Sequence, residues 1–173
     1  MIDLPDTPIL FQNGCFRDER GSLSVMEIPK NIISFNQVHQ CFVRSIKKHV
    51  LRGLHYQSGQ AAQAKIVTCM TGEILDYVVN INKRSDKFGE VWCYKLDELN
   101  SLFIPKHYAH GYLTLTSETV VHYAFDNFFN QELARTINFF DENLNLNLPV
   151  EKKDVIMSHG DANADCLSGD IFN

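Results

Sequence analysis

The feature that most constrains this chain of 173 residues is the short interval at which turn residues interrupt runs of β-branched and aromatic side chains. Such runs are typical of strands, and Gly, Pro, Asn, Asp or Ser at their ends is typical of tight turns. After the turn RDERGS, the runs in chain order are SLSVMEI, SFNQVHQCFVRSI, HVLRGLHYQ, AKIVTCM, EILDYVVNI, VWCYKL, NSLFIP, HGYLTLT and TVVHYAFDNFF. Roughly eight to twelve strands in one such chain predict an all-β fold, a β-sandwich or double-sheet jelly roll.

Residues 144–173 depart from this pattern, because they are polar and have no sustained periodicity. One short helix is predicted near Glu151, and the tail is expected to lie over the sheets, where its acids could reach the mouth of a pocket. The chain is 45% hydrophobic, and it is too short for two ordinary domains without a visible linker. Residues 1–173 are therefore predicted to form one domain.

Charge and cysteine usage argue against several classes of function. The formal net charge is −5 and no basic patch extends beyond Ile46–His49, so neither a nucleic acid nor an acidic membrane is an expected partner. The N-terminus lacks a basic start and no apolar run is long enough to span a membrane, which predicts a cytoplasmic protein. The five cysteines are scattered and never spaced as C-x-x-C, which predicts reduced packing thiols.

His55 and Lys65 lie only ten residues apart in two neighbouring runs. A half-buried histidine in a strand is more often a hydrogen-bonded packing residue, so His55 alone does not establish a site. Strand alternation puts Lys65 on one face with Gln63 and Val67. If that face is the interior, the ammonium loses its hydration and needs a paired acid or a functional task. An inward Lys65 therefore favours a functional site.

Tyr123 is the third candidate, from the run TVVHYAF. Alternation puts it on the face of Val121 and Phe125, while His122 points the other way. If Val121 and Phe125 line the interior, Tyr123 is inside and His122 is outside.

A metal site is an alternative, because jelly rolls often hold metals with histidines. Here His55 is followed two residues later by Gln57 where a second histidine would be expected, and the only close histidine pair is His107 and His110. Two loop ligands without an evident third make a weak site. The sequence therefore favours chemistry without a metal.

A histidine, a lysine and a tyrosine together suit proton transfer next to a carbonyl group. A ketone acidifies its α C–H bonds, a histidine can remove the proton, an ammonium can stabilise the enolate oxygen, and a tyrosine on the opposite face can return a proton. Return from the opposite face inverts the carbon. Such a reaction needs no nicotinamide, in keeping with a sequence that has no Gly-x-Gly-x-x-Gly fingerprint.

Six segments between Phe16 and Asp161 resemble, in order and spacing, the dTDP-4-dehydrorhamnose 3,5-epimerase family of cupin-fold enzymes: VLRGLHYQ, QAKIVTC, GEILDYVVNI, SDKFGEVW, LFIPKHYAHGYLTL and SHGD. The resemblance implies a homodimeric cupin jelly roll in deoxysugar biosynthesis. It implies a nucleotide-sugar substrate, a dTDP-4-keto-6-deoxyhexose, epimerised at C3, C5 or both without a cofactor.

The resemblance also assigns roles to residues. His55 looks like the base and Asp161 like the carboxylate that orients it. Lys65 resembles the lysine beside the C4 oxygen, and Tyr123 looks like the opposing acid. The substrate contacts are expected to be Phe16, Arg20, Gln40 and Arg52 for the nucleotide diphosphate and base, with His110 and Gln57 in the same pocket.

Several positions differ from the family pattern. Val25 stands where an acid is usual, Phe42 replaces an asparagine, His107 a glycine, and Phe128 and Phe129 a pair of tyrosines. The opening RGSLSVMEIP is more similar to the related sugar 3,4-ketoisomerases. These changes surround the sugar pocket more than the base, so the reaction type is better defined than the sugar.

Two other functions remain as alternatives. A 3,4-ketoisomerase moves a proton between neighbouring carbons on one face and should not need Tyr123. A noncatalytic nucleotide-sugar-binding cupin would retain Arg52 but lack a base or an acid. Because all four catalytic positions are filled, epimerisation is favoured, with C3 and C5 ahead of C3 alone.

Overall fold

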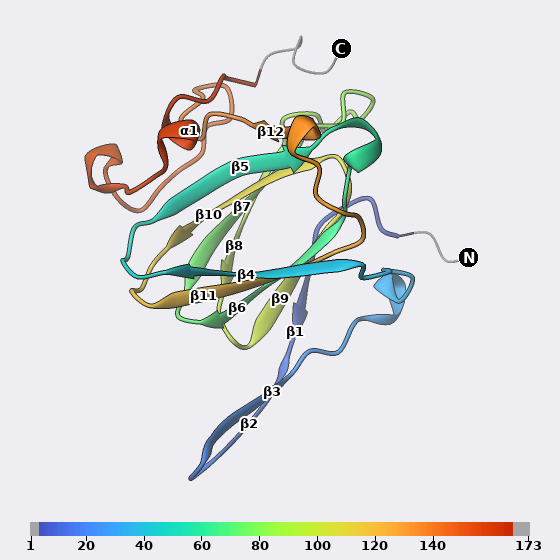
Figure 1. Cartoon of the computed structure of the whole chain (residues 1–173), viewed down its shortest axis with the longest axis vertical. Helices are drawn as coiled ribbons and strands as arrows, with labels where there is room; N and C mark the ends of the chain where they lie inside the picture. Colours follow the sequence, from blue (N-terminus) through green and yellow to red (C-terminus); the bar gives the residue numbers. More distant parts are fainter. Residues whose placement is uncertain (1–3, 168–173) are drawn as a thin grey trace.

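Two five-stranded antiparallel sheets pack face to face and form the body of the protein (Figure 1). This computed structural model describes residues 4–167. The first sheet has the order β1 (Ile9–Gln12), β9 (Asn100–Ile104), β6 (Lys65–Thr71), β11 (Thr119–Phe125) and β4 (His39–Ser45). The second has the order β12 (Ala134–Thr136), β5 (Leu51–Gln57), β10 (Tyr108–Thr114), β7 (Ile74–Asn80) and β8 (Val91–Leu96). The predicted all-β sandwich is therefore confirmed.

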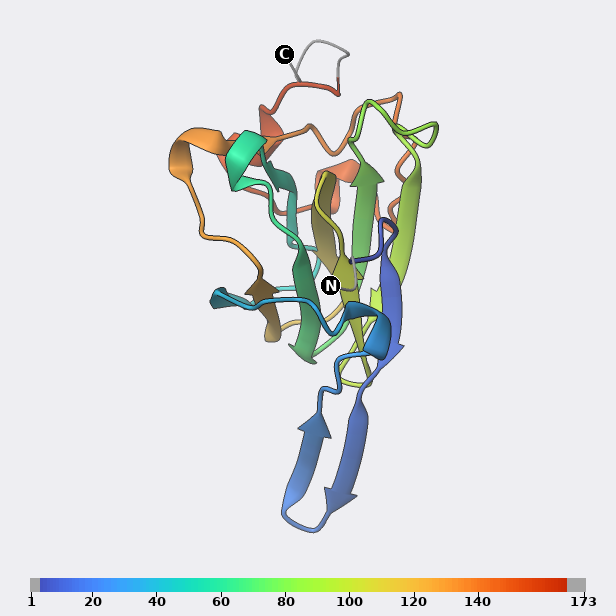
Figure 2. The ribbon, with the colours of Figure 1, turned by 90° about the vertical axis from the view of Figure 1, so that its right-hand side faces the viewer.

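Strands β2 (Gly14–Asp18) and β3 (Gly21–Val25) form a separate hairpin that projects beyond the sandwich (Figures 1 and 2). Its tip is the predicted turn, in which the Asp18 carboxylate accepts the backbone N–H of Arg20 at 2.8 Å. The predicted strand SLSVMEI is too long by three residues. The partner strand β2 begins at Gly14, which pairs with Val25, so residues after Val25 have no partner in the hairpin. The preceding residue, Asn13, donates its backbone N–H to the carbonyl of Leu99 instead.

Apolar side chains from both sheets fill the space between them. Leu54, Tyr77 and Leu113 contribute to one cluster, and Val67 and Val121 to a neighbouring one, all of them 2% exposed or less. Burial of a leucine or valine side chain contributes about 1.5–3 kcal/mol. The core thus holds β5, β6 and β11 in fixed relation, and these strands carry the candidate site residues.

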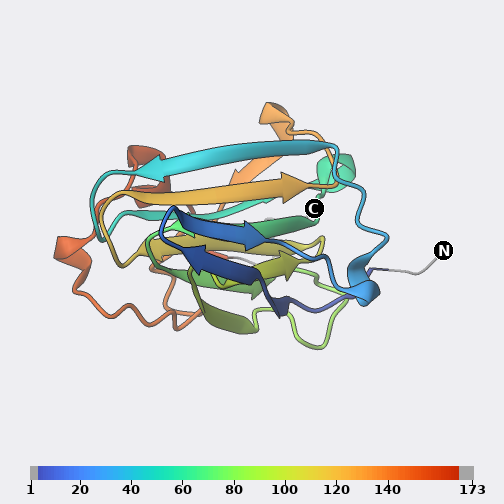
Figure 3. The same ribbon diagram turned by 90° about the horizontal axis from the view of Figure 1, so that it is seen from below.

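Strand β4 lies at the edge of the first sheet, where it runs beside β11 (Figure 3). The two strands pair in continuous register from Ser45 opposite Thr119 to His39 opposite Phe125. Paired residues point to the same face, so Cys41 lies beside Tyr123 on the inner face and Gln40 lies on the outer face. This register decides which part of β4 can meet a ligand.

The tail packs against β5, as expected. A 3₁₀ turn at Lys152–Asp154 lies beside the predicted position near Glu151, but the α-helix, α1 (His159–Ala162), comes later. Ser158 begins this helix by accepting the backbone N–H of Asp161 at 3.1 Å. Strands β1, β2 and β12 were not predicted. Runs of four and three residues, as in β1 and β12, are too short for alternation to reveal, and GCFRD of β2 has no alternation of apolar and polar residues. In the described part of the chain, no helix has the length and apolar character to cross a membrane.

Candidate active site

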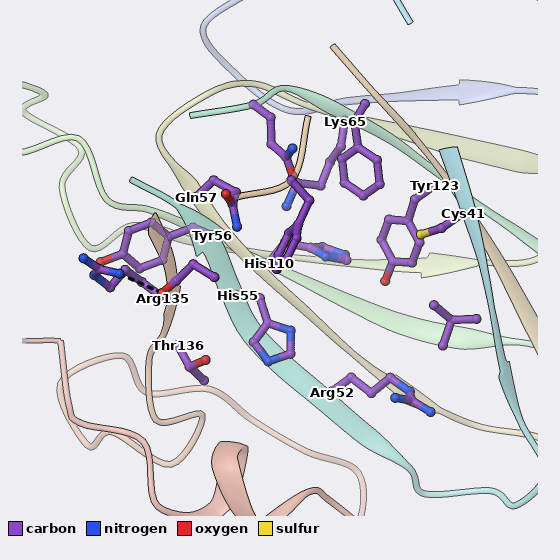
Figure 4. Close-up of a pocket in the computed structure, with 15 residues that line it drawn as sticks. Cys41, Arg52, His55, Tyr56, Gln57, Lys65, His110, Tyr123, Arg135 and Thr136 are labelled. Carbon is purple, nitrogen blue, oxygen red and sulfur yellow. Dashed lines mark hydrogen bonds between the residues drawn. The ribbon is translucent and has the colours of Figure 1, made fainter. Parts of the chain in front are cut away.

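A cavity of about 410 Å³ lies between the sheets and takes side chains from both of them (Figure 4). The second sheet contributes β5, β10 and β12, and the first contributes β4, β6 and β11. Six predicted site residues line it: Arg52, His55, Gln57, Lys65, His110 and Tyr123. Strand alternation and the resemblance therefore converge on one place.

His55 is bonded to a carboxylate that the tail supplies. Its Nε2 lies 2.6 Å from Oδ1 of Asp161, whose side chain is only 9% exposed, whereas the His55 side chain is 50% exposed. Burial raises the pKa of Asp161, but hydrogen bonds from His55, Ser158 and the Gly53 backbone outweigh it and hold the pKa below its usual value. An ionised carboxylate can only accept, so Nε2–H donates and Nδ1 is the nitrogen left to take a proton.

Lys65 begins β6 and faces the cavity although only 5% of its surface is exposed. Burial lowers the pKa of its ammonium to about 8, against the opposing attraction of Asp76 and Cys41. Its Nζ lies 5.9 Å from the Phe125 ring and has no hydrogen bond or ion pair with any residue among 4–167. The buried ammonium is thus available to an oxygen of a ligand.

Tyr123 enters the same cavity from β11 of the first sheet (Figure 4). Its ring stacks on Phe125 with centroids 5.7 Å apart. Burial raises the pKa of its hydroxyl, so the group keeps its proton at neutral pH and can donate it. His122 lies on the other face with Gln40 and Phe42, as alternation predicts.

Asp76 is a polar residue at the site that the sequence analysis missed. It lies on β7, is fully buried, and its Oδ2 is 2.7 Å from Nε2 of His110. Burial raises the pKa of Asp76 and lowers the pKa of His110, because it penalises the charged form of each. An aspartate within the apolar run EILDYVVNI was a usable signal, since a buried carboxyl needs a partner.

The histidine pair considered for a metal does not converge. His110 points inward to Asp76, while His107 is exposed in the preceding turn with φ of 66°. Within residues 4–167, no group of three or more His, Cys, Asp or Glu side chains is placed to hold a metal ion.

Three predicted substrate contacts lie away from the cavity in the single chain. Gln40 is on the outer face of β4, bonded to His122 at 3.2 Å. Phe16 is 65% exposed on the projecting hairpin, and Arg20 at its tip forms an ion pair with Asp18. Four other lining residues were not predicted, because their positions depend on strand register: Cys41, Val43, Arg135 and Thr136. Gln63 and Phe129 also line the cavity, in keeping with the predicted face of Lys65 and the predicted surroundings of the sugar pocket.

Comparisons with known proteins agree along almost the whole chain. A family model described as dTDP-4-dehydrorhamnose 3,5-epimerase matches residues 3–169. The dTDP-4-dehydrorhamnose 3,5-epimerase of Shigella flexneri is 35% identical over 163 residues, which cover 86% of this chain and 85% of that protein.

Two solved structures with bound ligands are similar to this chain in fold. The dTDP-6-deoxy-D-glucose-3,5-epimerase of Legionella pneumophila, in complex with dTDP-4-keto-L-rhamnose, is 31% identical with a TM-score of 0.85, over 94% of this chain and 88% of that one. The dTDP-4-dehydrorhamnose 3,5-epimerase of Bacillus anthracis, with TDP and PPi bound, is 28% identical with a TM-score of 0.84, over 92% of this chain and 94% of that one.

Proposed function

The chain belongs to the dTDP-4-dehydrorhamnose 3,5-epimerase family, and on that premise we propose that His55 and Tyr123 invert carbons of its sugar substrate. The protein is a nucleotide-sugar epimerase with the cupin fold of that family, and its activity belongs to deoxysugar biosynthesis. One observation carries the proposal: His55 and Tyr123 come from opposite sheets and line one cavity, with Lys65 beside them.

The first step is removal of a proton next to the C4 ketone. Nδ1 of His55 takes the proton, the C–H electron pair becomes a C=C bond, and the carbonyl electron pair moves to the C4 oxygen. Lys65 donates an N–H to this oxyanion, which is where its uncommitted charge has most effect. Asp161 stabilises the imidazolium that forms at His55.

The second step returns a proton from the other side of the ring. The Tyr123 hydroxyl gives its proton to the carbon, the C=C pair forms the new C–H bond, and the C4 carbonyl reforms with inverted configuration at its neighbour. His55 then loses its proton to solvent and Tyr123 regains one, so hydrogen from the solvent enters the product.

Arg52 supports binding of the nucleotide diphosphate. It lines the cavity, and its Nε is buried without a hydrogen-bond partner in the described part of the chain. A buried guanidinium donor without a partner favours an anionic ligand. The Legionella and Bacillus relatives hold dTDP-4-keto-L-rhamnose and TDP, respectively, so we propose that this chain binds a dTDP-linked 4-keto-6-deoxyhexose.

A homodimer is part of the same proposal. Phe16 and Leu23 form an apolar cross-strand pair on the hairpin, 65% and 62% exposed, and Phe42 on the edge strand β4 is 64% exposed. Exposed apolar groups on a projecting hairpin favour coverage by another chain. A second copy would cover them and bring Phe16 and Arg20 towards a cavity that they do not reach within their own chain.

The direct test is incubation of the enzyme with dTDP-4-keto-6-deoxyglucose in D₂O, with the product analysed by NMR. We expect deuterium at C3 and C5 with inversion at both carbons. Deuterium and inversion at C3 alone would show that the enzyme epimerises only C3. A 3-keto product would mean that the protein is a ketoisomerase and that the proposed roles are wrong.

A further inference from the structure

A carboxylate outside the cavity ties together the strands around Lys65. Asp126 follows the last residue of β11, and its side chain is only 8% exposed. Its Oδ1 accepts the backbone N–H of Ala64 at 2.7 Å, and its Oδ2 lies 3.2 Å from Nζ of Lys106. The backbone N–H of Asp126 also donates to the Ala64 carbonyl at 3.2 Å. Asp126 thus binds the residue that immediately precedes Lys65.

The strand register makes this contact relevant to the site. Lys65 is the first residue of β6, paired with Phe125 of β11 on one side and Ile104 of β9 on the other. Asp126 comes directly after Phe125, and Lys106 comes two residues after Ile104. The Asp126 carboxylate therefore connects the ends of β11, β6 and β9 beside Lys65.

The residue after Asp126 reinforces the same connection. The Asn127 side chain donates to the backbone carbonyls of Gln60 and Ala62 at 3.0 and 3.4 Å, and the Asn127 backbone carbonyl accepts an N–H from Nε2 of Gln63 at 3.2 Å. These residues belong to the loop that joins β5, which carries His55, to β6. The loop has no other regular structure than a 3₁₀ turn at Gly59–Ala61, so its course depends on such bonds.

We propose that Asp126 is a positioning residue for the epimerase, which fixes the start of β6 and so aims the Lys65 ammonium at the C4 oxygen of the sugar. This inference rests on the proposed role of Lys65. Asp126 acts through the backbone of Ala64 and does not touch the substrate. Misplacement of a reacting group by about 1 Å costs on the order of 10²-fold in rate.

The negative charge of Asp126 is not what acts on Lys65. The groups that act electrostatically on Lys65 are Asp76 of β7 and Cys41 of β4, and Lys65 in turn acts on His110 of β10. The Asp126 carboxylate is instead paired with Lys106, whose side chain is 46% exposed. Because the Lys106 end of this pair is open to solvent, its charge is screened, so the hydrogen bond to Ala64 should matter more than the ion pair.

The experiment compares Asp126→Ala with Asp126→Asn, which keeps an oxygen acceptor for Ala64 but loses the charge. Asp126→Ala should lower kcat by about 10-fold to 10²-fold with KM within about 2-fold, because only the placement of the ammonium is disturbed. Asp126→Asn should stay close to wild type. Glu118→Gln, at the far end of β11 where Glu118 pairs with Arg44, is the matched control for loss of a carboxylate.

A second readout separates positioning from general loosening. If Asp126→Ala only displaces the ammonium, Lys65 stays buried, its pKa stays at about 8, and kcat declines at the same alkaline pH as in the wild type. A decline that moves to higher pH would show that water has reached Lys65, which is general loosening of the site, and would contradict the proposal. If Asp126→Ala does not fold, Asn127→Ala removes two bonds to the same loop and should show the same pattern with a smaller loss.

Lys65→Met, measured in parallel, separates the role of Asp126 from the role of Lys65. Wild-type kcat in Asp126→Ala together with a large loss in Lys65→Met would overturn the positioning role and leave the lysine role intact. Wild-type kcat in Lys65→Met would overturn the lysine role, and the inference about Asp126 with it.

Discussion

The His55 side and the Lys65 side of the cavity support their ionisable groups in different ways. His55 is half exposed and bonded to an ionised carboxylate from the tail, whereas Lys65 is almost completely buried and its Nζ has no such partner in residues 4–167. A base that gains a proton needs a countercharge, but a cation that stabilises an oxyanion works best when its charge is uncommitted. The difference supports the proposed division of labour, with proton removal on the His55 side and charge stabilisation on the Lys65 side.

Loss of the base is expected to have the largest effect. His55→Asn should reduce deuterium exchange at the sugar carbons by about 10²-fold to 10⁴-fold, because Nδ1 no longer takes the proton. Binding of dTDP, measured by calorimetry, should be retained, since Arg52 is unchanged. Near-normal exchange in this variant would show that a residue other than His55 is the base, and the proposed difference between the His55 and Lys65 sides of the cavity would be wrong.

Loss of the ammonium should be the next largest effect. Lys65→Met keeps much of the side-chain volume but removes the donor to the enolate oxygen, so kcat should fall by roughly 10²-fold, as for other lost oxyanion donors. The thermal midpoint should not decrease, because the variant no longer buries a charge without a close ion-pair partner. Single-turnover kinetics with unchanged rates would show that the C4 oxygen is stabilised by another group.

The smallest effect concerns pH. Burial lowers the pKa of Lys65 to about 8, and the group must be protonated to stabilise the oxyanion. The kcat of the wild type should therefore decline as pH rises through about 8, where Lys65 loses its proton. The residual activity of Lys65→Met should lack this decline, and a decline that persists at the same pH would assign it to a different group.

Strand alternation predicted the inward positions of Lys65 and Tyr123 because it is a local property of an extended backbone. The partnership of His55 with Asp161 spans 106 residues, and only the family resemblance suggested it. Alternation alone gave no distance between strands, so it did not bring any pair of residues together.

Register and chain placement account for what the sequence did not reveal. Cys41 lines the cavity because it pairs with Tyr123, and a shift of one residue would have put Gln40 there. The turn RDERGS and the strand after it were predicted, but the partner strand β2 and the projection of the hairpin away from the cavity were not, since nothing local fixes the direction in which Phe16 points. The proposed role of Asp126 was not predicted, because it depends on a hydrogen bond to the backbone N–H of Ala64, 62 residues away in the sequence.

The most direct test of the division of labour is the configuration of labelled sugar formed by Tyr123→Phe in D₂O. His55 and Lys65 are intact in this variant, so the enolate should still form and deuterium should enter with retained configuration, while inverted product is lost. NMR of the sugar distinguishes the two outcomes. Inverted sugar at the wild-type rate would contradict the account, because the proton would then reach the opposite face without Tyr123.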